Sequence, residues 1–194
     1  MLKQIALAAS ALVLAACAHD APPASEAHGS DHAAEPAARP APQPASAMAQ
    51  IIDTSGALIG MASLDQGPHG VLMVVRIDAG GLSPGWHGLH FHEKGDCSDV
   101  GSFQLSGGHH GKGDGRHGLM NPAGPEMGDL PNIWAADDGS AGYEAFTALL
   151  ELAPALEGDG IALVIHEDRD DHLSQPIGGA GARVACGVIV EGGS

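Results

Sequence analysis

From residue 48 onward the chain consists of short apolar runs separated by clusters of glycine, proline, aspartate and serine. Eight such runs can be distinguished, at residues 49–53, 58–64, 70–78, 87–93, 132–136, 142–149, 161–166 and 182–190. Short strands with turn residues between them, and no convincing amphipathic helix, are typical of antiparallel sandwiches and barrels. We therefore predict an all-β, eight-stranded antiparallel domain over residues 48–194.

Two segments interrupt the regular spacing of these runs. Residues 95–131 and 167–181 are polar, rich in glycine and much longer than ordinary connections. Loops of this length in a compact domain usually carry function. Both segments lie beside histidines, so we expect them to build a site.

The first 17 residues have the pattern of an export signal. A single lysine is followed by a short apolar stretch and by Leu-Ala-Ala-Cys17, and the stretch is too short for a stable membrane span. The cysteine after Leu-Ala-Ala resembles the lipobox of bacterial lipoproteins. We predict a signal peptide at 1–16, acylation of Cys17, and a lipid that anchors the protein to the cell envelope without spanning it. The alternative is an incidental Cys17 with cleavage elsewhere.

Residues 18–47 are mostly alanine and proline and show no helical or strand period. Such a stretch cannot bury enough apolar surface to fold, so residues 17–47 are predicted to form a disordered, lipidated tether. His19, His28 and His32 lie within it. They are interpreted as solvated linker residues, with metal collection as the alternative.

The formal net charge of −16, with only eight lysines and arginines, limits the partners. It argues against binding to nucleic acid or to an anionic membrane surface through a basic patch. An anionic substrate would therefore need local positive charge. No motif separates a monomer from a homodimer.

Three cysteines are present in the sequence. With Cys17 assigned to the lipid, Cys97 and Cys186 remain as an even pair in an exported protein, which favours a disulfide over two free buried thiols.

Histidines recur in a pattern that suits transition metals. His90 and His92 alternate within a predicted strand, so their imidazoles project from the same face. Further histidines and an aspartate follow in or beside the long loops, at His109, His117, Asp129 and His166. Imidazole-rich sites suit copper and zinc, and a carboxylate among the ligands suits zinc.

Six motifs in this region resemble the copper/zinc superoxide dismutases, specifically the exported bacterial type. They are GLHFHEKGDCS (88–98), GGH (107–109), HGLMNP (117–122), GDLPN (128–132), HEDRDD (166–171) and QPIGGAGARVACG (175–187). The resemblance implies a Greek-key β-barrel and an enzyme that disproportionates superoxide with copper and zinc, protecting the periplasm.

The resemblance also implies roles for individual residues. The implied ligands are His90, His92, His109 and His166 for copper, and His109, His117 and Asp129 for zinc. His109 would bridge the two metals and donate a proton, and Arg183 would steer and orient superoxide. Asp170 would link a copper histidine to a zinc histidine, and Cys97–Cys186 matches the family's disulfide.

The chain departs from the family at two positions. Glu126 stands where a third zinc histidine is usual, and His110 stands where an aromatic residue is common. Glutamate can ligate zinc, so Glu126 either completes a His, His, Glu, Asp site or points to solvent and leaves zinc completed by water or poorly bound. His110 is interpreted as a polar packing residue rather than an extra ligand.

Other polar residues nearby are assigned no metal role. His69 is expected in a turn, His87 at a strand start and His172 in a loop, while Lys112 and Arg116 are surface cations or contributors to a local field. Two alternative functions remain, a periplasmic copper-binding or copper-buffering protein on the same fold and a copper-only dismutase.

Overall fold

The computed structural model describes residues 46–112 and 116–192. The chain divides into two units, Met1–Ala41 and Pro42–Ser194, and every described residue belongs to the second. The predicted signal peptide, Cys17 and the three tether histidines lie outside the described residues. Among those described, no helix is long and apolar enough to cross a membrane.

The described chain is almost entirely β-structure, which confirms the predicted class. An eight-stranded antiparallel sheet has the order β5-β8-β9-β1-β2-β3-β7, with β10 also paired to β1. Its strands are β1 (Ser46–Asp53), β2 (Leu58–Gly67), β3 (Gly70–Ile77), β5 (Leu89–His92), β7 (Ala141–Thr147), β8 (Ala162–His166), β9 (Arg183–Val188) and β10 (Val190–Glu191). A second, two-stranded sheet pairs β4 (Gly85–His87) with β6 (Ile133–Ala135).

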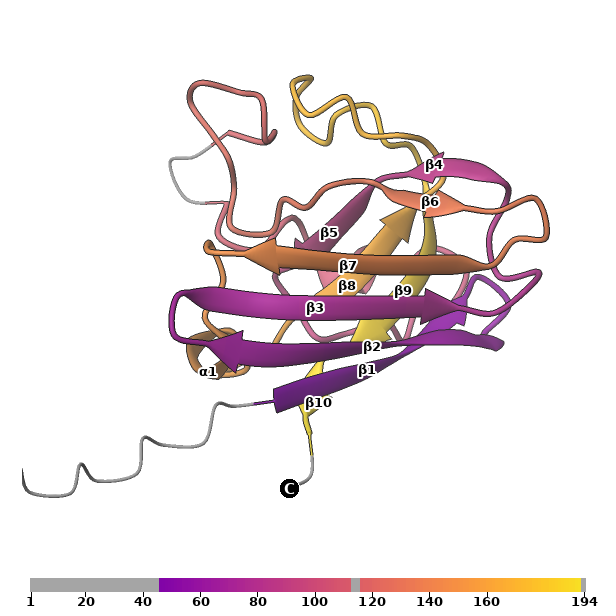
Figure 1. Cartoon of the computed structure of the whole chain (residues 1–194), viewed down its shortest axis with the longest axis horizontal. Coiled ribbons are helices and arrows are strands. Elements are labelled where there is room, and N and C mark those ends of the chain that lie inside the picture. The colour runs from indigo at the N-terminus through magenta and orange to yellow at the C-terminus, as the bar shows by residue number, and fades with distance from the viewer. Residues whose placement is uncertain (1–45, 113–115, 193–194) are drawn as a thin grey trace, which may run out of the picture. The chain divides into compact units, whose positions relative to one another are not determined.

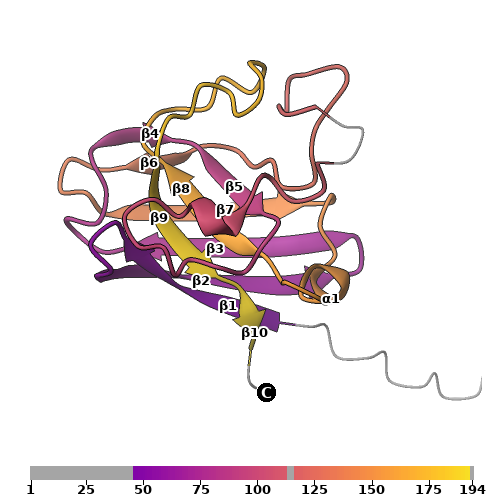
Figure 2. The same ribbon diagram turned by 180° about the vertical axis from the view of Figure 1, so that it is seen from behind.

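The large sheet curls into two layers. Figures 1 and 2 show β1, β2, β3 and β7 on one side and β5, β8 and β9 on the other. The chain crosses between the layers after β3, after β5 and again after β7, so strands distant in sequence become neighbours in the sheet. These crossings place β5 beside β8 and so bring histidines from separate segments of the chain together.

The core fills the space inside the curl. Residues alternate between the core and the outer face, so that β3 buries Val71, Met73, Val75 and Ile77. The same period in β1 buries Ala47, Ala49 and Ile51. This alternation follows from the two-residue side-chain repeat of a strand.

Several strand boundaries differ from the sequence-based expectation. β1 begins at Ser46, three residues before the expected start at Ala49, because Ala47 pairs with both Leu64 of β2 and Glu191 of β10. The run at 87–93 divides at Gly88, whose N–H bonds to the Asp168 carbonyl instead of a ladder partner. The run at 182–190 likewise divides into β9 and β10.

Two short helices were not predicted, the 3₁₀ turn η1 (Gln104–Ser106) and α1 (Leu152–Ala155). Neither is long enough to show a helical period in the sequence.

β8 is buried on both of its faces. Leu163 and Ile165 belong to the main core, whereas Val164 packs in a second cluster with Phe103 and the two cysteines. Cys97 and Cys186 form a disulfide that closes a sequence separation of 89 residues, as predicted. The cluster fixes the first of the two long loops, which lies within residues 95–131, to the outer face of β8 and β9.

Candidate metal centre

The first long loop folds back along β5 and supplies residues to both of its ends. Loop residues form isolated antiparallel bridges with β5, His109 opposite His92 and Asp129 opposite His90. The Phe91 carbonyl accepts from the His110 N–H, and the Phe91 N–H donates to the Gly128 carbonyl. The loop therefore lies against the strand as a short additional ladder.

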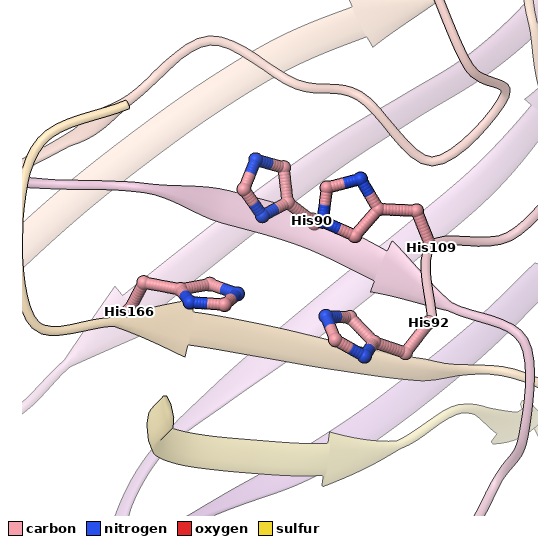
Figure 3. Close-up of side chains that lie close together, drawn as sticks. All are labelled: His90, His92, His109 and His166. Carbon is pink, nitrogen blue, oxygen red and sulfur yellow. The ribbon is translucent and has the colours of Figure 1, made fainter. Parts of the chain in front are cut away.

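Two histidines of β5 face away from the main core. Leu89 and Phe91 point into the core, so His90 and His92 share the opposite face. His166 ends the neighbouring strand β8, whose Ile165 pairs with Leu89. Figure 3 shows the rings of His90, His92, His109 and His166 converging on one space.

The four converging imidazoles are buried and arranged to bind a metal ion. One ring nitrogen from each lies within 4.8 Å of the others. The nitrogens Nδ1 of His90 and Nε2 of His92, His109 and His166 are all buried without a hydrogen-bond partner. Buried polar atoms are normally paired, so four unpaired lone pairs facing one space fit a metal that prefers imidazole, such as copper.

The opposite ring nitrogens are held by acceptors that fix the tautomers. His90 Nε2 lies 2.7 Å from Asp170 Oδ2, and His92 Nδ1 lies 3.0 Å from the Gly107 carbonyl oxygen. His166 Nδ1 lies 3.2 Å from the Gly181 carbonyl oxygen. An N–H directed at these acceptors leaves the inward-facing nitrogen deprotonated and ready to ligate.

A second group of donors adjoins the first. His109 Nδ1 lies 2.8 Å from Glu126 Oε2 and 3.3 Å from Asp129 Oδ1, and His117 Nδ1 lies 2.8 Å from the same Asp129 oxygen. Bond lengths near 2.0 Å in a tetrahedron place zinc ligands about 3.3 Å apart. The separation of His109 from Asp129 matches this spacing, whereas the two separations of 2.8 Å are hydrogen-bond lengths that would have to open slightly to admit zinc. His109 thus presents one nitrogen to each group.

Glu126 lies at the second group and is 3% exposed, which contradicts the alternative in which it points to solvent. Its backbone N–H donates to Asp129 Oδ2, and its carboxylate contacts His109. The four residues with donor atoms mutually within 4.8 Å are, however, His90, His109, His117 and Asp129. Glu126 therefore approaches the group from the side of His109.

Asp170 links the two groups of donors by contacting one histidine of each. Its Oδ2 is 2.7 Å from His90 Nε2, and its Oδ1 is 3.1 Å from His117 Nε2. Asn132 bonds to both the backbone N–H and the carbonyl of Asp170. Gly178 has φ +63°, and a Cβ there would collide with the Asp170 carboxylate, so this glycine permits the second long loop to close over Asp170.

The electrostatics of the two groups differ. Burial lowers the pKa of His90 to about 4 and, with the charge of His90, lowers the pKa of His166 to about 3. Burial also disfavours a charge on His117, but the hydrogen bonds with Asp129 and Asp170 outweigh it and raise the pKa of His117 to about 10. The imidazoles of His90 and His166 are therefore neutral at neutral pH, whereas His117 carries a proton that a bound metal would have to displace.

Arg183 begins β9 directly opposite His166. Its Nη1 donates to the Phe103 carbonyl at 2.6 Å and to Ser106 Oγ at 3.0 Å, and its Nη2 donates to the Gly107 carbonyl at 2.8 Å. These acceptors all belong to the first long loop, so the guanidinium is fixed beside the imidazoles. Its positive charge further lowers the pKa of His92, which burial already lowers.

The remaining histidines lie outside both groups of donors. Both ring nitrogens of His87 approach backbone carbonyls, those of His166 and Ser83. His69 is exposed in the turn between β2 and β3, as expected. His110 lines a surface pocket with Met127, and burial lowers its pKa.

Three loop residues complete the placement of the expected residues. His172 has φ 60° and contacts Asp170, with its Nδ1 3.5 Å from Oδ2. Lys112 and Arg116 are both exposed.

Several groups that build the site had no sequence signal. The carbonyls of Phe103, Gly107 and Gly181 orient site residues through backbone atoms, which residue identity does not reveal. Ser106 is fully buried and bonds to Arg183, yet a serine in a loop carries no such indication by itself.

The fold and the site together define a class of protein, an all-β domain in which strands and two long loops hold adjoining imidazole-rich metal sites. The family model for copper/zinc superoxide dismutase matches residues 58–189. The chain belongs to this family.

Similarity to individual proteins agrees with this assignment. The chain is 47% identical over 151 residues to a "Superoxide dismutase [Cu-Zn]" of Caulobacter vibrioides, covering 74% of this chain and 85% of the relative. Among solved structures, the Cu/Zn superoxide dismutase of Brucella abortus matches with a TM-score of 0.61 and 30% identity, covering 74% of this chain and 98% of that one. A SOD-like protein from Bacillus subtilis matches with a TM-score of 0.65 and 30% identity, covering 74% and 97%.

Proposed function

We propose that this protein is an exported enzyme that converts two superoxide anions and two protons into one molecule of oxygen and one of hydrogen peroxide. The observation that carries the proposal is the set of four buried, unpartnered imidazole nitrogens beside a fixed arginine. Membership of the copper/zinc superoxide dismutase family supports the same activity.

The donor atoms support a specific assignment of ligands. His90, His92, His109 and His166 would hold copper, and His109, His117 and Asp129 would hold zinc with Glu126 as the fourth ligand. Two carboxylates make this zinc site more anionic than one with three histidines. His109 would be shared by the two metals, because its Nε2 faces the first group and its Nδ1 faces the second.

Copper supplies a one-electron couple that can accept an electron from one superoxide and return it to another. Arg183 provides the local positive charge that draws an anion to an otherwise acidic molecule. His109 can hold a proton at Nε2, the nitrogen that faces the copper group, and pass it to the departing peroxide. Asp170 keeps the His90 and His117 rings in their binding tautomers.

A superoxide-consumption assay on copper-loaded protein, with and without zinc, tests the proposed activity. We expect rapid consumption that depends on copper and is highest with both metals. Tight copper binding without consumption would identify a copper-binding or copper-buffering protein. Full activity without zinc would identify a copper-only dismutase.

The N-terminal pattern supports location in the periplasm on a lipid anchor. Mass spectrometry of the protein purified from membranes should show a diacylglycerol-modified Cys17 as the first residue. A Cys17→Ser variant should lose the lipid and leave the membrane fraction. An unmodified N-terminus at another position would contradict the anchor while leaving the proposed activity intact.

A further inference from the structure

The hydroxyl of Ser106 lies between Arg183, which would attract superoxide, and His92, which would bind copper. Ser106 ends η1 and is fully buried. Its Oγ is 3.0 Å from Arg183 Nη1 and 3.2 Å from His92 Nδ1, and it is 2.8 Å from the Phe103 carbonyl oxygen. One hydroxyl therefore contacts the arginine, a proposed copper ligand and the loop backbone.

These three contacts use the full hydrogen-bonding capacity of a serine. The single O–H donates to the Phe103 carbonyl, and the two lone pairs accept from Arg183 and from the His92 Nδ1–H. This arrangement requires the proton of His92 on Nδ1, which leaves the unpartnered Nε2 as the ligating atom. The Gly107 carbonyl also contacts both side chains, because it accepts hydrogen bonds from His92 Nδ1 and from Arg183 Nη2.

The backbone next to Ser106 adopts an unusual conformation that serves the same contacts. Phe103 has φ 53°, in the left-handed region that residues other than glycine seldom occupy. Its ring is buried in the disulfide cluster, and its carbonyl accepts from Arg183 and from Ser106. The loop is therefore fixed at the disulfide on one side and at the arginine on the other.

We propose that Ser106 is a positioning residue, whose hydroxyl couples the orientation of Arg183 to the tautomer and ring plane of His92. The inference rests on the proposed copper site and adds a residue to it. An alanine lacks the hydroxyl oxygen, so Arg183 Nη1 would have one acceptor fewer and His92 Nδ1 would keep only the Gly107 carbonyl. Anion binding and the copper environment should then change together.

The test compares Ser106→Ala with the parent and with Ser106→Thr, which keeps the hydroxyl, all loaded with copper and zinc. Azide serves as a small anion probe, titrated through the visible absorption of Cu(II), and electron paramagnetic resonance reports the copper ligand field. We expect Ser106→Ala to bind azide roughly three- to tenfold more weakly and to show altered Cu(II) hyperfine splitting. Ser106→Thr should restore both properties.

Ser102→Ala is the matched control, because the exposed Ser102 hydroxyl bonds to Asp99 in the same loop without touching Arg183 or His92. This variant should leave the azide affinity and the Cu(II) spectrum unchanged. Unchanged azide affinity and spectrum in Ser106→Ala would overturn the proposal. Loss of the fold or of copper in Ser106→Ala would also overturn it, since the residue would then serve packing.

The two readouts require only bound copper. A parent protein that binds copper and azide but consumes no superoxide would defeat the proposed activity without affecting the result for Ser106.

Discussion

At the scale of single residues, Glu126 distinguishes the proposed zinc site, because it stands where a third zinc histidine is usual. Its buried carboxylate lies 2.8 Å from His109 Nδ1, where zinc would bind. Glu126→Gln should bind zinc at least about tenfold more weakly, because a neutral amide replaces a charged ligand, whereas Glu126→His should retain tight binding. Competition with a chromogenic chelator measures the zinc affinity.

Glu157→Gln removes an exposed carboxylate away from the proposed ligands and serves as the control. Equal zinc affinity in Glu126→Gln, Glu157→Gln and the parent would show that Glu126 is not a ligand.

Arg183 is the residue whose charge should affect the encounter with superoxide. Arg183→Glu should lower the second-order rate at low ionic strength by about tenfold or more, and the difference should shrink as salt screens the field. Stopped-flow consumption of superoxide at several salt concentrations measures this effect, alongside copper content.

Arg169→Glu makes the same change of charge at an exposed arginine whose guanidinium lies 5.9 Å from the centre of the Trp86 ring. A similar loss of rate in Arg169→Glu and Arg183→Glu would attribute the effect to net charge rather than to the position of Arg183.

Residue types and their spacing predicted much of the candidate site. The alternation of His90 and His92 predicted a shared face, and the family motifs singled out the loop residues that join them. Ser106 and the carbonyl of Gly107 could not be found in this way. Their contribution depends on where the loop backbone passes, which is a tertiary property.

At the scale of elements, strand positions followed from local pattern, whereas their interruptions followed from contacts made later in the chain. The strand at 87–93 divides because Gly88 packs against Ala180, where a Cβ would approach to 2.8 Å. That contact comes from the second long loop, so no local sequence pattern reports it. The four-residue helix α1 likewise depends on its surroundings, since its first N–H bonds to the Gln66 side chain.

Among the elements, the disulfide ties the first long loop to β9. Replacing Cys97 and Cys186 with serine removes a link across 89 residues. The chain-entropy model predicts a loss of about 4 to 5 kcal/mol in the free energy of unfolding. Urea denaturation of the metal-free variant and the metal-free parent measures the difference.

Treatment of the parent with a reductant should reproduce the effect of the double substitution. A loss below about 1 kcal/mol in both experiments would mean that the unfolded chain gains little freedom from breaking the link.

At the scale of the whole molecule, the pKa shifts predict a stability maximum near neutral pH for the metal-free protein. The pKa values of His90 and His166 are lowered to about 4 and about 3, so below pH 6.5 the unfolded chain binds protons that the folded chain does not. Unfolding is then favoured as pH falls, by roughly 1 kcal/mol per pH unit for each histidine.

His117 has the opposite effect on the alkaline side. Because its pKa is raised to about 10, its contribution is fully present below pH 6.5 and is lost as pH rises through 10. The depressed pKa values of Asp129 and Asp170, caused by hydrogen bonds that outweigh their burial, add a loss of stability below about pH 4.

Urea denaturation at pH 5, 6.5 and 9, with and without copper and zinc, measures this pH dependence. The metal-free protein should be most stable near pH 6.5 and should weaken in both directions. The His117→Gln variant should lose only the alkaline limb, because the acid limb belongs to the buried histidines His90, His92 and His166. Bound metals replace protons on the ligating nitrogens, so the loaded protein should show a flatter profile from pH 6.5 to 9. A metal-free profile as flat as the loaded one would contradict the protonation states that we assign to these histidines.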